Sequence, residues 1–172
     1  MMPRPLPSTT SEASVSLLFV TAAQDDPVAQ PLLNELAVEY AQRYDNTQAA
    51  VLAWLQNHPP AEFVPPDGEL LIGLRNGVPV TGGAFRRFDH RTAELKRIWT
   101  HRAYRRRGYA KALLVQLEAR IVSRGYRRVY LTTGNRQPEA EALYEASGYT
   151  RLVEPLPSSE PVFPIAFVKD LP

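Results

Sequence analysis

The sequence predicts a single α+β domain built on a mixed sheet, and three observations support this prediction. A chain of 172 residues with 44% apolar content can bury one core but is short for two domains. Residues 69–86 read as two strands around Asn76-Gly77, the dipeptide that best fits a two-residue hairpin turn. A strand at 93–100, a helix ending at Arg124-Gly125 and the strand "YRRVYLTTG" form a βαβ unit, whose strands should be parallel.

The N-terminal third predicts a tail, a strand and two helices. Residues 1–14, rich in Pro, Ser and Thr, are expected to be a mobile tail that precedes a domain at 15–172. "SLLFVTAA" at 16–23 predicts a largely buried first strand. A helix should begin near Pro31, because a proline deeper inside it would clash with the preceding turn. Apolar residues at helical spacing define the two helices: Leu32, Leu33, Leu36, Tyr40 and Tyr44, then Val51, Leu52, Trp54 and Leu55.

The central strands carry two further local predictions. Gly82-Gly83 inside the second hairpin strand indicates a bulge or a close backbone approach. Strict alternation in "AELKRIWT" at 93–100 places Leu95, Arg97 and Trp99 on one face of the sheet and Glu94, Lys96, Ile98 and Thr100 on the other.

The C-terminal part completes the sheet. One face of the central helix carries Ala110, Leu113, Leu114, Leu117 and Ile121. Pro138 opens another helix, which Gly148 ends. Its apolar side carries Ala140, Leu143, Tyr144 and Ser147. "YTRLV" and "VFPIAFV" are then the last strands.

Composition excludes several kinds of site. The net charge of +2 gives no bulk attraction for polyanions, so any anion site must be local. Cysteine is absent, which removes disulfides and thiolate chemistry and fits the cytoplasm. No apolar run approaches the ~18 residues of a membrane span. Three well-separated histidines give no support for a metal site, and none is expected.

The basic residues gather at one junction, where the strand at 93–100 gives way to a helix. Five of them fall within ten positions: Arg102, Arg105, Arg106, Arg107 and Lys111. The first amides of a helix have no intrahelical acceptor and favour an anion such as a pyrophosphate. Gly108 would let the backbone come close to it, and Ala110 would leave its path clear. The alternative is a solvated basic turn with no ligand.

The order of these features resembles that of the GNAT superfamily of acetyl-CoA-dependent N-acetyltransferases. An Arg/Gln-x-x-Gly-x-Gly/Ala motif, matched at Arg105, Gly108 and Ala110, follows a strand and precedes a leucine-rich helix. After the next strand comes "GNRQPEAEALYEASGY" at 134–149. The resemblance covers residues 68–153, and the N-terminal elements more loosely. It implies a mostly antiparallel sheet with a central parallel pair that splays apart, flanked by helices.

The resemblance also implies acetyl-CoA as cosubstrate. Its pyrophosphate would lie on the amides of residues 106–111, and its pantetheine arm along the main chain of residues 98–100. The residues expected to bind it are Ile98, Trp99, Thr100, Arg105, Arg106, Arg107, Gly108, Tyr109, Ala110, Lys111 and Asn135.

Two residues are candidates for catalysis. Glu94 matches a position where many GNAT enzymes carry a glutamate that removes the proton of the acceptor amine, which is mostly protonated at pH 7. The alternative for Glu94 is an ion pair with Lys96 or Arg97. Tyr144 matches the family tyrosine that protonates the departing thiolate, and its alternative is core packing. Transfer is expected to be direct, without an acyl-enzyme.

The acceptor side gives fewer signals. Tyr40, Tyr44 and the loop at 154–164 border the acceptor in such folds, although both tyrosines also fit a core. Trp54 and Trp99 are expected to be packing anchors.

The expected function is N-acetylation of a primary amine of a small molecule or amino-acid-like acceptor. The protein would be a monomer or homodimer with no nucleic-acid or membrane partner. Two alternatives remain: a non-catalytic acyl-CoA sensor or partner-binding domain, and a nucleic-acid patch at the basic junction.

Overall fold

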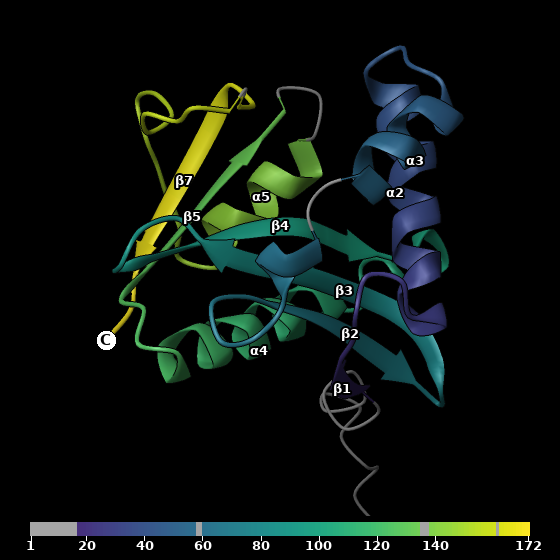
Figure 1. Cartoon of the computed structure of the whole chain (residues 1–172), viewed down its shortest axis with the longest axis horizontal. Helices are drawn as coiled ribbons and strands as arrows, with labels where there is room; N and C mark the ends of the chain where they lie inside the picture. Colours follow the sequence, from purple (N-terminus) through teal and green to yellow (C-terminus); the bar gives the residue numbers. More distant parts are fainter. Residues whose placement is uncertain (1–16, 58–59, 135–137, 161) are drawn as a thin grey trace, which may run out of the picture.

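The predicted α+β architecture with a mixed sheet is confirmed (Figure 1). The computed structural model describes residues 17–57, 60–134, 138–160 and 162–172. In this part of the chain the strands form one seven-stranded sheet of order β1-β2-β3-β4-β5-β7-β6. Neighbouring strands are antiparallel except β4 and β5, which are parallel as the βαβ prediction requires. The strands are β1 (Leu17–Thr21), β2 (Glu69–Arg75), β3 (Val78–Arg87), β4 (Thr92–Thr100), β5 (Arg128–Thr133), β6 (Thr150–Arg151) and β7 (Ile165–Asp170).

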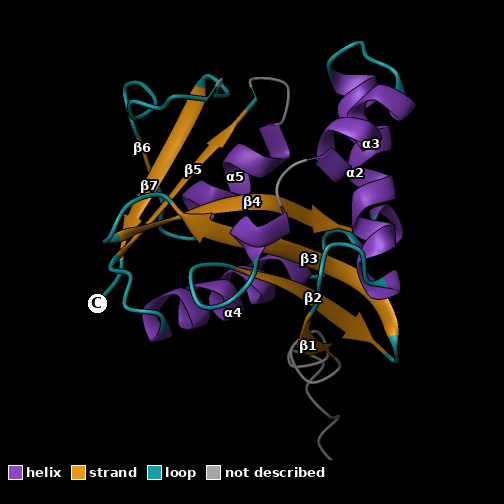
Figure 2. Cartoon of the chain, viewed as in Figure 1, coloured by secondary structure: helices purple, strands orange, loops and turns teal. Residues whose placement is uncertain are grey.

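The helices lie close to their predicted positions (Figure 2). The α-helices are α2 (Gln30–Arg43), α3 (Gln48–Asn57), α4 (Tyr109–Ser123) and α5 (Pro138–Ala146), and short 3-10 turns occur at Pro27–Ala29, Pro60–Phe63 and Arg102–Tyr104. Asp26 caps the first 3-10 turn by accepting a hydrogen bond from the Val28 amide at 2.9 Å. Pro31 then falls in the first turn of α2, where a missing N–H costs nothing.

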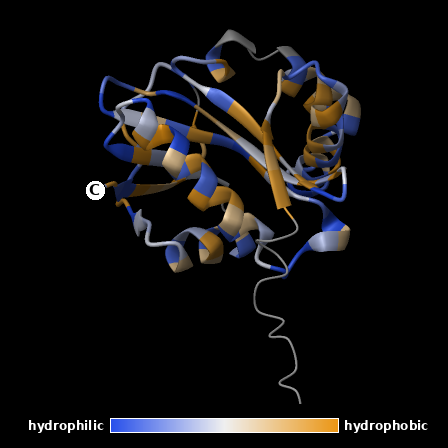
Figure 3. Ribbon diagram, turned by 90° about the horizontal axis from the view of Figure 1, so that it is seen from below, coloured by the Kyte–Doolittle hydropathy of each residue, from blue (hydrophilic) through white to orange (hydrophobic). Residues whose placement is uncertain are grey.

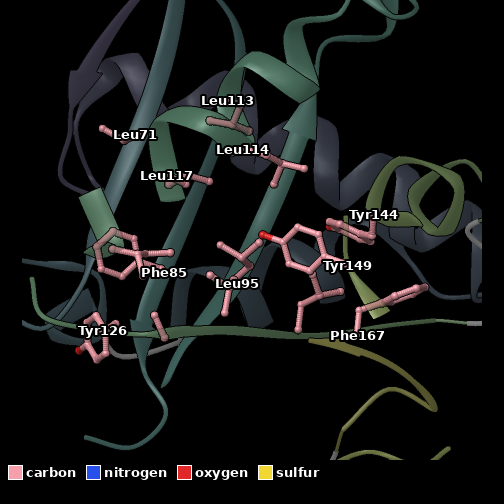
Figure 4. Close-up of a cluster of buried hydrophobic side chains, with 14 of the residues drawn as sticks. Leu71, Phe85, Leu95, Leu113, Leu114, Leu117, Tyr126, Tyr144, Tyr149 and Phe167 are labelled. Carbon is pink, nitrogen blue, oxygen red and sulfur yellow. The ribbon is translucent and has the colours of Figure 1, made fainter. Parts of the chain in front are cut away.

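Two apolar cores lie on opposite faces of the sheet. Helices α2 and α3 cover the core that contains Leu70, Ile72 and Trp99. Helices α4 and α5 cover the core that contains Phe85 and Phe167, part of which Figure 4 shows. Figure 3 shows that the helices carry both apolar and polar residues, as expected of helices that pack on a sheet by one face.

The end of α4 remote from the basic junction is held by a buried carboxylate. Glu69 of β2 is fully buried and accepts hydrogen bonds of 2.7 Å from Arg120, Arg124 and the Thr21 hydroxyl. A buried charge of this kind is tolerated because it is paired and hydrogen-bonded. These contacts tie the C-terminal end of α4 to β2.

The hairpin is confirmed, and the buried position of the first strand is corrected. Asn76 and Gly77 both take positive φ, at 49° and 80°, as the two-residue turn demands. The first strand was wrongly predicted to be largely buried, because β1 lies at the edge of the sheet and Leu18 is 64% exposed.

The strict alternation predicted for β4 is wrong, because the strand contains a bulge. Arg97 has φ 58°, and the register with β3 shifts between Gly82 and Ala84. Leu95 therefore packs in the α4 core while Trp99 packs in the α2 core, on the other face. The predicted close approach at the glycine pair is present: a Cβ on Gly82 would lie 2.9 Å from the Leu71 carbonyl oxygen, and one on Gly83 would lie 2.6 Å from the end of the Ile98 side chain.

Candidate active site

The parallel strands β4 and β5 are paired over a short length only. Their register joins Thr92–Glu94 to Arg128–Tyr130. Beyond these three pairs the described strands separate, although β4 continues to Thr100 and β5 to Thr133. The separation leaves backbone groups of β4 without a neighbouring strand on that side, at the place predicted for a splayed pair.

The basic junction forms the N-terminus of α4. Gly108 caps the helix in the left-handed conformation, with φ 81°, and Arg106 also has positive φ. The first intrahelical bond runs from Ala112 N to Gly108 O, so the amides of residues 109–111 lie ahead of it. A Cβ on Gly108 would meet nothing within 4 Å. The junction therefore presents amides beside open space, which suits an anion.

One cavity of about 810 Å³ connects this helix N-terminus with the gap between β4 and β5. Residues from the basic junction, from both separated strands and from α5 line it. Its lining includes Ile98, Trp99, Thr100, Arg105, Arg106, Gly108, Tyr109, Ala110, Lys111, Leu131, Thr132, Thr133 and Tyr144. Nine of the eleven residues predicted to bind the cofactor are in this lining. Their role as ligands of a cofactor stays a prediction.

The two remaining residues of that set stand apart. Arg107 lies over the Tyr104 ring, 5.3 Å from its centroid, and is not part of the lining. Asn135 lies outside the described residues.

Tyr109 lines the cavity, but its ring is buried and its hydroxyl accepts a hydrogen bond from Arg75 at 2.8 Å. Tyr109 can therefore offer a ligand its backbone amide.

Ion pairs with α2 hold the junction in place. Arg105 pairs with Glu39 at 2.7 Å and donates to the Thr100 carbonyl at 3.2 Å. His101 caps the 3-10 turn by accepting from the Ala103 amide and lies 3.5 Å from Glu35. Arg105 thus links β4, α2 and the helix N-terminus, while Arg106 and Lys111 line the same cavity.

Tyr144 lies on α5 with its ring in the core and lines the cavity. The ring centroids of Tyr149 and Phe167 both lie 5.7 Å away (Figure 4). Burial raises the pKa of Tyr144 well above its usual value of 10, and Tyr40 adds to the rise. The hydroxyl is therefore protonated at neutral pH, as a proton donor must be. Packing and proton donation, the two interpretations from sequence, are compatible here.

The side of the cavity that was predicted to border the acceptor is lined by aromatic side chains. Tyr40 lines the main cavity and an adjoining hollow of about 330 Å³, while Tyr44 lines the hollow alone. Burial, followed by the charge of Glu39, raises the pKa of Tyr40 to about 12. The Tyr44 ring lies 6.0 Å from that of Phe163, and a Cβ on Gly134 would collide with its hydroxyl. Tyr44 thus reaches from α2 to the end of β5.

Comparison with known proteins agrees with this geometry. The Acetyltransferase (GNAT) family matches residues 30–149, about 70% of the chain. The chain belongs to the GNAT acetyltransferase family. A search of curated protein sequences finds no significant match.

Solved structures show the same GNAT fold at low identity. A GNAT-family acetyltransferase from Staphylococcus aureus is 17% identical with a TM-score of 0.71, covering 91% of this chain and 99% of that one. PaiA N-acetyltransferase from Thermoplasma acidophilum, in complex with coenzyme A, is 14% identical with a TM-score of 0.69, covering 90% and 99%. A GNAT acetyltransferase from Elizabethkingia anophelis with acetyl-CoA bound is 16% identical with a TM-score of 0.61, covering 91% and 99%.

Glu94, the candidate base of this GNAT protein, is buried in ion pairs. Its Oε1 accepts from Arg86 Nε at 2.9 Å, and its Oε2 lies 3.5 Å from Lys96 Nζ. Lys96 lines the cavity, whereas Glu94 does not. The contact with Lys96 is the one that the alternative interpretation expected. The role of Glu94 as base stays a prediction, and the geometry would require Lys96 or a water to lie in the proton's path.

Arg86 joins this carboxylate to the loop predicted to border the acceptor. It also pairs with Glu62 at 2.7 Å and with Glu160 at 2.9 Å. Burial alone would lower the pKa of Arg86, but the hydrogen bonds and charges of these three glutamates outweigh burial and raise it. Arg86 therefore stays charged and ties the 3-10 turn at Pro60–Phe63 and the loop before β7 to the sheet.

Sequence reasoning missed several residues of the site. Trp54 was wrongly expected to be a packing anchor: it is 56% exposed and lines the cavity, whereas Trp99 is buried as expected. Phe63 and Arg97 also line the cavity. An aromatic at helical spacing gives no signal that separates a core position from a cavity wall. For Arg97 the signal was present, since a charged residue was predicted on the same face as Leu95 and Trp99.

Two features are absent from the part of the chain that the structure describes: a membrane-spanning helix and a metal-binding cluster. None of its helices is long and apolar enough to cross a bilayer. No group of three or more His, Asp or Glu side chains in this part is placed to hold a metal ion.

Proposed function

We propose that this protein transfers an acetyl group from acetyl-CoA to a primary amine of a small or amino-acid-like acceptor. The observation that carries the proposal is the single cavity that runs from the N-terminal amides of α4 to the gap between β4 and β5. Membership of the GNAT acetyltransferase family supports acyl transfer. The proteins of the same fold that bind acetyl-CoA or coenzyme A support the cosubstrate.

The residues at the helix N-terminus fit a pyrophosphate. The amides of residues 109–111 can donate to it, and the helix dipole favours its negative charge. Arg106 and Lys111 line the cavity beside these amides and can add charge-assisted hydrogen bonds. The open space at Gly108 is where a larger side chain would obstruct the ligand. Arg107 and Asn135 remain predicted contacts.

The gap between β4 and β5 fits the pantetheine arm. The main chain of residues 98–100 lies past the last β4–β5 pair, so its backbone groups can bind an extended amide-containing chain as a strand would. Bound acetyl-CoA supplies an acyl group that is already activated as a thioester. An acyl-enzyme is therefore unnecessary, and the amine can attack directly.

Two proton transfers complete the proposed reaction. Tyr144 holds a proton at its buried hydroxyl and is proposed to give it to the departing thiolate sulfur. Glu94 is proposed to draw the proton from the acceptor amine, through water or Lys96. In this proposal α2, α3 and the loop before β7 border the acceptor.

A thiol-release assay with acetyl-CoA and a panel of primary amines tests the proposal. We expect thiol release that depends on the acceptor, together with binding of coenzyme A measured by titration calorimetry. Binding without acceptor-dependent release would favour the acyl-CoA sensor. The absence of coenzyme A binding would refute the cofactor site itself. Arg106→Gln should weaken coenzyme A binding about tenfold, the value of one charge-assisted contact.

A further inference from the structure

Arg97 is a buried cation held by neutral groups. It lies at the β4 bulge and is only 8% exposed. Its guanidinium donates to the Gln24 side-chain carbonyl and to the Leu55 backbone carbonyl, and it lies 5.0 Å from the Phe63 ring centroid. These contacts orient the guanidinium but leave its charge uncompensated, because all three partners are neutral.

Acidic groups around this site are already committed to other cations. Among the described residues, no carboxylate is within ion-pair distance of Arg97. Glu62 acts on it electrostatically but pairs with Arg86. The three glutamates that line the cavity are also paired: Glu39, Glu139 and Glu160. Arg97 is thus the buried cation of the described cavity lining that lacks an anionic partner.

Burial is the main perturbation of Arg97. It lowers the pKa of Arg97 to about 10, against the smaller opposing effects of Tyr40 and Glu62. The guanidinium is still charged at neutral pH. Removing one charge from water without a counter-charge is expensive, and an anion that enters the site recovers part of that cost.

The cavity is the route by which such an anion would arrive. Arg97, Leu55 and Phe63 all line it, so the guanidinium lies among cavity residues. In sequence, Arg97 directly precedes residues 98–100, where the proposed acyl carrier would lie. The adjoining hollow, lined by Tyr40, Trp54 and Phe163, offers apolar surface of a size suited to a side chain.

We propose that Arg97 binds the carboxylate of the acceptor, which makes the acceptor an amino acid or a related amine with a carboxylate. This inference rests on the proposed acetyltransferase function and narrows its substrate class. Arg97 acts as a specificity-determining residue that binds the carboxylate, while the amine points toward the strand gap. The acceptor's side chain then lies against Tyr40, Trp54 and Phe163.

Matched pairs of acceptors test the proposal without any mutation. The probes are phenylalanine, leucine and methionine, each compared with its carboxamide, which keeps the amine and side chain but removes the negative charge. We expect kcat/KM of the wild-type protein to be at least tenfold higher for the acids, as one charge-assisted pair implies. Equal or faster acetylation of the amides would overturn the inference.

A variant tests whether Arg97 is the residue that causes the preference for acids over amides. Arg97→Gln should reduce the preference for acid over amide to about one, mainly through the KM of the acceptor, and should leave the Kd for coenzyme A unchanged. Arg87→Gln is the matched control, because Arg87 is exposed on β3 and does not line the cavity. Retention of the preference in Arg97→Gln would assign the carboxylate to another group and refute our proposal. If Arg97→Gln fails to fold, the wild-type comparison still decides.

The two proposals fail in different ways. A protein that binds coenzyme A and acetylates only amines without a carboxylate contradicts the role of Arg97 but supports the acetyltransferase. A protein that binds coenzyme A but acetylates no member of the panel contradicts the carboxylate inference and favours the acyl-CoA sensor over the acetyltransferase. Failure to bind coenzyme A at all contradicts the proposed function.

Discussion

Tyr144 shows how burial can fix the protonation state of a single side chain. Its phenol is 5% exposed, lies in the core beside Tyr149 and Phe167, and yet lines the cavity. Because the anionic form is disfavoured by burial, the hydroxyl keeps its proton throughout the neutral range. A protonated hydroxyl is what the proposed transfer to a thiolate requires.

Tyr144→Phe should lower kcat about 10²-fold, the size of a general-acid contribution, while the Kd for coenzyme A stays near the wild-type value. Steady-state thiol release and calorimetry measure the two quantities. Tyr149→Phe is the matched control, since its hydroxyl donates to Glu118 at 3.1 Å and it does not line the cavity. A wild-type rate in Tyr144→Phe would leave this residue a packing role only.

Glu94→Gln separates two roles of one carboxylate. Loss of the charge next to Arg86 and Lys96 should destabilise the fold by about 1–3 kcal/mol, which thermal unfolding measures. Base catalysis would add a fall in kcat/KM that is largest at low pH, where the amine is most protonated. If instead the pH profile keeps its shape and only Tm falls, the ion pair accounts for Glu94.

The pairing of Glu94 shows where sequence reasoning stops. Its type and position suggested a base, but Arg86 lies directly opposite it on β3, a neighbour that only the strand register reveals. The same limit hid the uncompensated charge of Arg97, because its partners Gln24 and Leu55 come from segments far away in the chain.

At the scale of elements, α4 has two ends of similar backbone geometry in different surroundings. Gly108 begins the helix at φ 81° and Gly125 follows it at φ 91°, and a Cβ on either would meet nothing within 4 Å. Only Gly108 lines the cavity. The two glycines therefore form a natural pair for an experiment.

Both Gly108→Val and Gly125→Val should lose about 1–2 kcal/mol of stability, because each forces a side chain into the left-handed region. Only Gly108→Val should weaken coenzyme A binding, by more than tenfold, since its side chain would enter the ligand's path. Calorimetric titration of both variants checks this. Equal affinities in the two variants would remove the ligand from the start of α4.

The elements differ in how well the sequence predicts them. The hairpin follows from Asn76-Gly77, whose backbone requirement is local, and α4 from a long apolar period with a glycine at its end. The β4 bulge has no signal in its own strand: nothing in residues 93–100 interrupts the alternation, and the register shift lies opposite the glycine pair of β3. The exposed position of β1 likewise depends on the order of strands in the sheet.

At the scale of the whole molecule, ligand binding should raise the free energy of unfolding. A ligand that binds only the folded state, at 100 times its Kd, stabilises it by about 2.7 kcal/mol. For a chain of this size that raises Tm by about 5–10 °C. We expect coenzyme A to produce such a shift, and pantetheine, which lacks the pyrophosphate, to produce a smaller one. Equal shifts would argue against the anion site, and no shift with either would argue against the cavity as a whole.

Because β4 and β5 are paired over three residues only, peptide groups farther along both strands have no partner strand on one side in the described part of the chain. Beyond the pair Glu94–Tyr130, the described strands β4 and β5 each have an unpaired strand edge inside the sheet. An unpaired strand edge normally pairs readily with other chains. Here side chains of α5, together with Tyr40 and Phe163, line the cavity beside this edge. Among residues 98–100, the amides that point away from β3 should consequently exchange deuterium faster than those bonded to β3, and should slow down once a ligand pairs with them.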